Sequence, residues 1–169
     1  MRLLALTTML LAAIPVAGGA SLASGRAGSA GVTIGLPGGW HAIPLALPPG
    51  LHVDAEPVVR IAAASGPISF GNGGCGEFPY SFPETAVALV VLEWARPTPG
   101  VFPHRPRRFT ATTLPVHRAP ALECFDGPGG SVEFADHGRR FDAFLLLGRH
   151  ASARLADRAR AVLDTLRVR

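Results

Sequence analysis

The stretch SVEFADHGRRFDAFLLL, residues 131–147, decides the fold. It holds two runs rich in aromatic and aliphatic residues, 131–135 and 140–147, which are typical of β-strands. The tripeptide Asp-His-Gly at 136–138 separates them, and its glycine can adopt the positive φ that a tight hairpin turn needs. The pattern therefore predicts an antiparallel hairpin in the last third of the chain.

Further strands are predicted where apolar residues alternate or dominate: 31–36, 58–64, 86–94 and 109–114. The segment 86–94 is almost continuously apolar, so we expect it to be the central strand, buried on both faces. The aromatic segment 78–82, with prolines at 79 and 83, is expected to run extended at the surface or at a sheet edge. Trp40 follows a Pro-Gly-Gly turn and is expected to anchor the core.

The C-terminal segment has the periodicity of an amphipathic helix. Its apolar residues recur at helical spacing and form one stripe: Leu155, Ala159, Val162, Leu163 and Leu166. Ser152 is the expected N-cap, and Arg160 is expected on the polar face, paired with Asp164. One helix packed on a mainly antiparallel sheet of five or six strands gives an α+β fold with two layers.

The N-terminus predicts export. Arg2 precedes an apolar run, 3–16, and small residues follow, which is the pattern of a secretory signal peptide. We assign residues 1–23 to this peptide, with cleavage after Ala23 or, alternatively, after Ala20. The run is shorter than the roughly 20 apolar residues of a membrane-spanning helix, and no later run is a better candidate. We therefore expect no transmembrane segment in the mature chain.

The rest of the chain is expected to be extracytoplasmic or secreted. No cysteine lies near the cleavage site, which argues against a lipoprotein anchor, and the single Arg2 argues against the twin-arginine route. Residues 24–30 are small and polar and predict a flexible lead-in. Residues 31–169 have the length of one domain. Retention at the envelope and release from it both stay open.

The two cysteines, Cys75 and Cys124, are expected to form a disulfide that ties this domain together. An even number of cysteines in an oxidising compartment favours this pairing. The bond would close a loop of about 49 residues and contribute about 4 kcal/mol in the chain-entropy account. A catalytic thiol at Cys75 is the competing interpretation, but the spacing indicates no partner histidine.

Short motifs carry a resemblance to exported proteins. The segments 138–148, 151–152 and 161–166, together with the opening 36–40 (Leu-Pro-Gly-Gly-Trp), resemble small uncharacterised exported proteins of actinobacterial type. The chain is also similar to the exported PsbP-like and LpqN-like domains. This resemblance implies a helix laid over an antiparallel sheet and an accessory or binding role without catalysis. It assigns no functional residue.

Signals for cofactors and metals are weak. Residues 71–76 fit G-x-G-x-x-G, but Pro79 and Pro83 prevent the helix that would face a dinucleotide phosphate. The six histidines include no H-E-x-x-H and no i,i+4 pair. His52 with Asp54 is the best local metal pair, and exposed loop residues explain it more simply. We therefore expect no cofactor and no metal.

Signals for catalysis are also weak. There is no G-x-S-x-G elbow, since Ala63 stands where a glycine would precede Ser65. The acidic residues between 123 and 136 are close in sequence, yet nothing places two of them across a cleft. No catalytic residue can be named. Because a Ser-His-carboxylate site can be dispersed along a chain, a small secreted hydrolase stays as the alternative function.

The arginines indicate the preferred function. All 16 basic residues are arginine, and five of them lie between Glu93 and Glu123 with no acidic residue among them: Arg96, Arg105, Arg107, Arg108 and Arg118. Guanidinium groups match phosphate and carboxylate geometry, so these five are the candidate anion-binding residues. A solvated surface is the simpler interpretation.

These features together predict a non-catalytic exported protein, a binding or accessory module at the cell envelope. Its partner would be an anionic envelope polymer or an acidic protein surface. Nucleic acid is not expected as a partner, because few aromatic residues interleave with the arginines and the compartment is extracytoplasmic.

Overall fold

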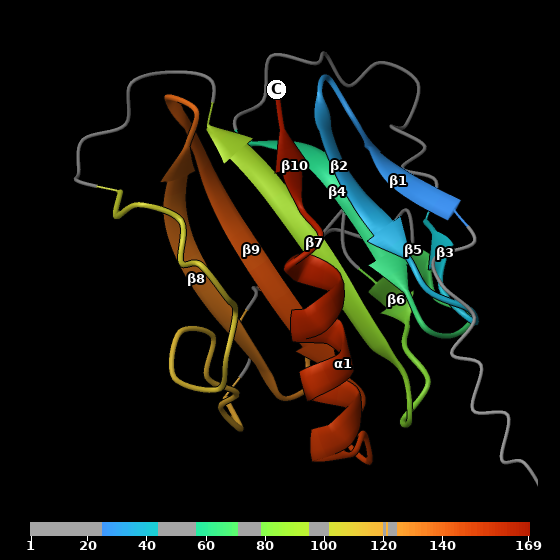
Figure 1. The fold of residues 1–169 in the computed structure, drawn as a ribbon. Coiled ribbons are helices and arrows are strands. Elements are labelled where there is room, and N and C mark those ends of the chain that lie inside the picture. The colour runs from blue at the N-terminus through green and yellow to red at the C-terminus, as the bar shows by residue number, and fades with distance from the viewer. Residues whose placement is uncertain (1–24, 44–56, 71–78, 95–101, 120, 122–124) are drawn as a thin grey trace, which may run out of the picture.

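The computed structural model describes residues 25–43, 57–70, 79–94, 102–119, 121 and 125–169. Its largest element is an antiparallel five-stranded sheet with the order β3-β4-β7-β9-β8. The strands are β3 (His41–Ala42), β4 (Val58–Ala64), β7 (Val87–Trp94), β8 (Gly129–Asp136) and β9 (Arg139–Leu147). Helix α1 (Ala153–Leu163) covers one face of this sheet (Figure 1). The predicted two-layer α+β fold is confirmed.

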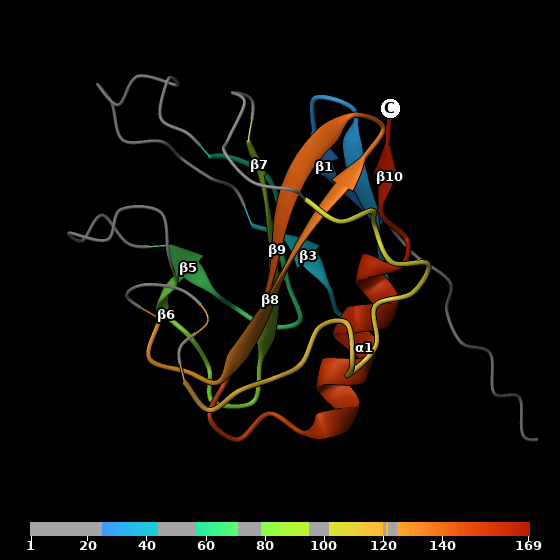
Figure 2. The same ribbon diagram turned by 90° about the vertical axis from the view of Figure 1, so that its left-hand side faces the viewer.

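A three-stranded antiparallel sheet shares the helical layer. Its order is β1-β2-β10, and its strands are β1 (Gly25–Ser29), β2 (Val32–Leu36) and β10 (Arg167–Val168). Figure 2 shows this small sheet on the same side of the five-stranded sheet as α1. Strand β2 buries Val32, Ile34 and Leu36 and leaves the residues between them partly exposed, as the alternation predicted.

Strand β1 corrects the prediction of a flexible lead-in at 24–30. It pairs with β2 over its whole length, from Gly25 opposite Leu36 to Ser29 opposite Val32. The pairing uses backbone groups, so small residues can form it even though their strand propensity is low. Residues 1–24, which include the predicted signal peptide, lie outside the described residues.

Strand β7 is the central strand and is buried on both faces, as predicted. Val87, Leu89 and Val91 pack in a core under α1 and the small sheet. Ala88 and Val90 pack in a second cluster on the opposite face. Because neither face meets solvent, the strand has no polar alternation, which explains its continuous apolar sequence.

The predicted hairpin is formed by β8 and β9. Its register runs from Asp136 opposite Arg139 to Gly129 opposite Leu146. The two turn residues, His137 and Gly138, have φ of 51° and 73°. Positive φ at both central positions is the geometry of the two-residue turn that matches the twist of the strands.

Helix α1 begins where the sequence predicted. The side-chain oxygen of Ser152 accepts a hydrogen bond from the backbone N–H of Leu155, as an N-cap does. The stripe of Ala159, Val162 and Leu163 is buried against the sheet. The apolar periodicity therefore gave the correct packing face.

Arg160 differs from its prediction. It is only 6% exposed, whereas the periodicity placed it on the polar face. Its Nε donates to the carbonyl of Leu114, and its Nη1 donates to Asp157 at 2.6 Å, so its partner is not Asp164. The segment that follows residue 102 covers this side of the helix, which periodicity along the helix alone does not reveal (Figure 2).

The predicted strand at 109–114 is wrong. The backbone turns here, with the N–H of Leu114 donating to the carbonyl of Thr110 at 2.8 Å. The N–H of Thr110 donates to the Thr113 hydroxyl, a local bond that competes with strand pairing. Phe109 and Leu114 are both buried in the core, and their burial accounts for the apolar signal.

A two-stranded pair, β5 (Ser69–Phe70) and β6 (Pro79–Ser81), confirms the extended chain expected within 78–82. Residues 71–78 and 122–124, which hold Cys75 and Cys124, lie outside the described residues, so the disulfide stays a prediction. Within the ranges that the structure describes, no helix is long and apolar enough to cross a membrane.

Candidate functional site

The described arginines differ in what their side chains contact. One group pairs with carboxylates: Arg60, Arg105, Arg139, Arg149 and Arg160. A second group is exposed and has no side-chain partner within the described part of the chain: Arg26, Arg107, Arg108, Arg118, Arg154, Arg167 and Arg169. Only members of the second group can offer a guanidinium to a ligand without breaking a contact of the fold.

Glu93 shows what the first group does. This carboxylate is 6% exposed and accepts hydrogen bonds from Arg139 at 2.6 and 2.8 Å and from Arg60 at 2.5 Å. The hydrogen bonds from Arg139, with those from Arg60, hold the pKa of Glu93 below its ordinary value, although burial opposes them. Arg139 also donates to the carbonyls of Ala30 and Arg169. The cluster joins the two sheets and is structural.

Arg105, one of the candidate anion-binding residues, contacts other parts of the fold. Its Nη1 donates to Asp136 and to the carbonyl of Leu166, both at 3.0 Å, and its Nη2 donates to the carbonyl of Asp164. A cation at carbonyls just past the end of a helix complements the helix dipole. Arg105 therefore fastens the segment after residue 102 to the end of α1, while its role in anion binding stays a prediction.

Asp136 is held by the same contact. Burial alone would raise the pKa of this carboxyl, but the hydrogen bonds from Arg105 and His137 outweigh it, and the pKa lies below its ordinary value. Asp136 therefore carries the negative charge that Arg105 needs as a partner. Because Arg105 also donates to the carbonyls of Asp164 and Leu166, the Arg105–Asp136 pair connects β8 to the end of α1.

The other predicted arginines are distributed along one segment. Arg107 and Arg108 are exposed, two and three residues after the Arg105 tie. Arg118 is also exposed but follows His117, which pairs with Gly129 at the opposite end of β8. Arg96 lies outside the described residues. The structure thus brings Arg107 and Arg108 together and sets Arg118 apart from them.

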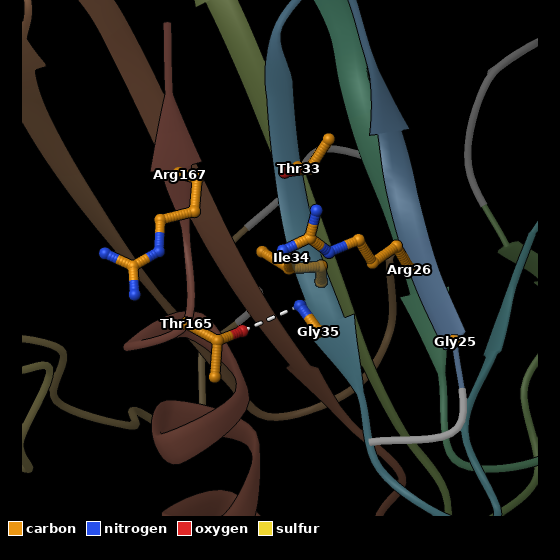
Figure 3. A pocket seen from close by; sticks show the side chains of 7 residues that line it. All are labelled: Gly25, Arg26, Thr33, Ile34, Gly35, Thr165 and Arg167. Atoms are coloured by element: carbon orange, nitrogen blue, oxygen red, sulfur yellow. Dashed lines mark hydrogen bonds between the residues drawn. The ribbon is translucent and has the colours of Figure 1, made fainter.

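A groove on the outer face of the small sheet adds two arginines that the sequence did not single out. It has a volume of about 440 Å³ and is lined by Gly25, Arg26, Thr33, Ile34, Gly35, Thr165 and Arg167. Figure 3 shows Arg26 reaching from β1 over β2, while Arg167 extends from β10 on the other side. Because β1 and β10 both pair with β2, the fold brings the two arginines to one surface.

No carboxylate side chain lines this groove. The segments that form it, 25–43 and 165–169, contain no aspartate or glutamate. Several described carboxylates are paired with arginines elsewhere in the fold, as at Glu93 and Asp136. Two exposed guanidiniums with no carboxylate side chain among the lining residues give the groove a potential that attracts anions.

Asp142 is a carboxylate with a different environment. Trp94 Nε1 donates to its Oδ2 at 2.8 Å, while its Oδ1 is buried with no partner among the described atoms. Burial raises the pKa of Asp142, the Trp94 hydrogen bond opposes that shift, and Glu133 adds to it. Trp94 and Asp142 lie side by side on β7 and β9, so this contact belongs to the sheet.

The contacts of the described residues identify no catalytic or metal-binding group. Within the described ranges, no hydrogen bond joins a serine to a histidine, and no cluster of three His, Cys, Asp or Glu side chains could hold a metal ion. The acidic partners of His137 and His150 are Asp136 and Glu84, and both histidines are exposed.

The chain was compared with protein-family models, curated proteins and solved structures. No family model, curated protein or solved structure matches the chain. The resemblance to exported domains therefore stays a prediction, and the arrangement of arginines is the guide to function.

Sequence reasoning found the loop arginines and missed Arg26 and Arg167. These two stand near opposite ends of the described chain, and only the pairing of β1 and β10 with β2 makes them neighbours. One signal was present: no acidic residue lies between 25 and 43 around Arg26 or after Asp164 near Arg167. That signal does not specify a groove, because pairing of such short strands is not visible in composition.

Proposed function

We propose that this protein is an exported, non-catalytic module that binds an anionic polymer of the cell envelope. Four exposed arginines would carry the binding, and we call them the outer arginines: Arg26, Arg107, Arg108 and Arg167. The observation that supports this proposal is their lack of any carboxylate partner among the described residues, while other arginines are paired within the fold.

The fold supports treating the outer arginines as parts of one binding face. Arg105 donates to the carbonyls of Asp164 and Leu166, and the N–H of Phe109 donates to the Asp164 side chain at 2.7 Å. These bonds fasten the segment that carries Arg107 and Arg108 next to the residues that precede Arg167. Figure 2 shows this segment, α1 and the small sheet on one side of the five-stranded sheet.

A polymer suits this arrangement better than a single small ion. Each exposed guanidinium contributes little on its own, because water and salt screen it. Several contacts along one chain act together, since the first contact raises the effective concentration for the next. The expected signal peptide at 1–23 and the resemblance to exported accessory domains support a polymer located outside the cytoplasm.

Retention on immobilised polyanions tests the proposal. The protein, purified after expression of the whole chain, is eluted with a salt gradient from polyphosphate and from polyglutamate resins. We expect salt-dependent retention, with R107A/R108A and R26A/R167A each eluting at clearly lower salt than the unaltered protein.

The matched control is R149A/R154A. Like each test variant, it removes two positive charges. These come from exposed positions before and within the first turn of α1, at the other end of the helix from β10. We expect it to elute close to the unaltered protein. Equal shifts in all three variants would mean that net charge alone sets retention, and the absence of retention on both resins would overturn the proposal.

A further inference from the structure

Three hydrogen-bond donors line the groove from three neighbouring strands. Arg26 of β1 is opposite Gly35, and Arg167 of β10 is opposite Thr33. Directly opposed residues point to the same face of an antiparallel sheet, and so do residues two apart on one strand. Arg26, Thr33 and Arg167 therefore share the outer face of the small sheet, and all three line the groove.

The absence of a side chain at Gly35 shapes the space between these donors. Gly35 is opposite Arg26, and Figure 3 shows the Arg26 side chain extending over β2 on the groove side. A glycine within a strand often marks a place where another group approaches the backbone closely. The missing side chain at Gly35 thus lets Arg26 reach across β2 on the face that Thr33 shares.

The wall on the helix side of the groove is fixed by the fold. The Thr165 hydroxyl accepts a hydrogen bond from the N–H of Gly35 at 2.8 Å and donates one to the carbonyl of Val162 at 2.7 Å. Thr165 therefore connects the end of α1 to β2 and has no donor left for a ligand (Figure 3). The Thr33 hydroxyl and the two guanidiniums have no side-chain partner within the described ranges.

We infer that this groove binds a phosphate group, which deepens the proposed function and rests on it. The two guanidiniums carry two positive charges, which a phosphate group with up to two negative charges balances better than a carboxylate with one. A tetrahedral phosphate presents three or more oxygens in different directions and can accept from all three side chains. Arginine forks also match phosphate geometry in particular.

The groove has room for more than a free phosphate ion. Its volume of about 440 Å³ falls within the range of about 300–1,000 Å³ that is usual for ligand pockets, and it is much larger than one oxyanion. The groove therefore has room for the group to which the phosphate is attached. A phosphate carried on an envelope polymer would place this group in the groove and its neighbours along the other outer arginines.

The test is a two-dimensional NMR titration at constant ionic strength. The probes are inorganic phosphate, glycerol 3-phosphate and, as the carboxylate control, acetate. We expect saturable shifts of the groove amides, those of Gly25, Thr33, Gly35 and Thr165, with both phosphate probes and only weak, non-saturating shifts with acetate. R26A and R167A should each weaken phosphate binding about tenfold, the usual scale for one charge-assisted hydrogen bond.

Two further variants separate the groove from the rest of the surface. R107A/R108A should keep its affinity for phosphate, because neither residue lines the groove. Thr33→Asp should abolish binding, since it adds a negative charge on the groove face, at a partly exposed residue directly opposite Arg167. Melting temperatures of all variants confirm that the protein is folded.

The outcomes distinguish the two proposals. Phosphate titration without saturation, acetate binding as tightly as phosphate, or an unchanged affinity in R26A and R167A would overturn the phosphate site even if polymer retention holds. Saturable phosphate binding without retention on any polyanion resin would support the groove site and overturn the polymer function. Tighter binding of polyphosphate than of polyglutamate at equal charge would support both.

Discussion

Arg139 binds Glu93 in a bidentate manner: its Nε donates to Oε1 at 2.6 Å and its Nη2 to Oε2 at 2.8 Å. The pair bridges β9 and β7, and Arg139 extends the contact to the carbonyls of Ala30 and Arg169 at one end of the small sheet, where the Arg169 N–H also donates to Gly31. This single side chain therefore fastens the small sheet to the large one.

Replacing Glu93 by glutamine should strongly destabilise the protein. The change leaves two largely buried arginines, Arg60 and Arg139, without a compensating negative charge. We expect a loss of about 3 kcal/mol, or about 6–12 °C in Tm for a chain of this size, in thermal unfolding followed by circular dichroism. Asp126→Asn, which breaks an exposed pair with Arg149, is the control and should change Tm little. Similar effects of the two variants would contradict this assignment.

The same carboxylate predicts sensitivity to acid. The pKa of Glu93 in the folded protein lies below its ordinary value of 4.5, so its ionised form stabilises the fold fully above that pH. This contribution is lost as the pH falls through the folded pKa. We expect the Tm difference between the unaltered protein and Glu93→Gln to shrink steadily below pH 4.5. A difference that stays constant down to pH 2 would show that charge is not its source.

Asp142 should behave in the opposite way. Burial raises its pKa above the ordinary value of 3.8, so this group favours folding at low pH and disfavours it as the pH rises through the folded pKa. Asp142→Asn removes the buried charge and keeps an oxygen for Trp94 Nε1. We expect a higher Tm at pH 7 and no gain near pH 3.8. A lower Tm at pH 7 would mean that the negative charge itself is needed.

Local patterns predicted those parts of the fold that depend on neighbours in sequence. The β8–β9 hairpin needs only Gly138 and two apolar runs, and the N-cap at Ser152 needs only one hydroxyl before a helical stripe. Strand β1 and the turn at 110–114 also use local bonds, from Ser29 opposite Val32 and from the Leu114 N–H to the Thr110 carbonyl, but neither has an apolar pattern that matches its structure. Gly25–Ser29 has no strand propensity of its own and is ordered by β2.

For the candidate site, too, the sequence shows which arginines are present but not which of them the fold uses. The run of arginines from Arg96 to Arg118 is visible in the sequence, but the contacts of Arg105 with Asp136 and Leu166 depend on tertiary packing. A charge pattern reports how many guanidiniums a segment carries and not which of them the fold uses. Arg26 and Arg167 show the converse, because only the order β1-β2-β10 brings them together.

Substitution of Arg105 tests whether arginines that contact the fold differ in role from exposed arginines without a side-chain partner. Arg105→Ala removes donors from Asp136 and from two carbonyls at the end of α1, so we expect a loss of about 2 kcal/mol and a correspondingly lower Tm. R107A/R108A removes two exposed side chains without partners among the described residues and should leave Tm nearly unchanged.

Arg105→Ala and R107A/R108A should therefore show opposite patterns in Tm and in retention on polyphosphate. Arg105→Ala should unfold at lower temperature yet keep salt-dependent retention on polyphosphate below its Tm, because its guanidinium faces Asp136 and the end of α1. R107A/R108A should keep its Tm and elute at clearly lower salt. If Arg105→Ala instead kept its Tm and lost retention, Arg105 would be a ligand-binding residue after all, and its contact with Leu166 would contribute nothing to the stability of the fold.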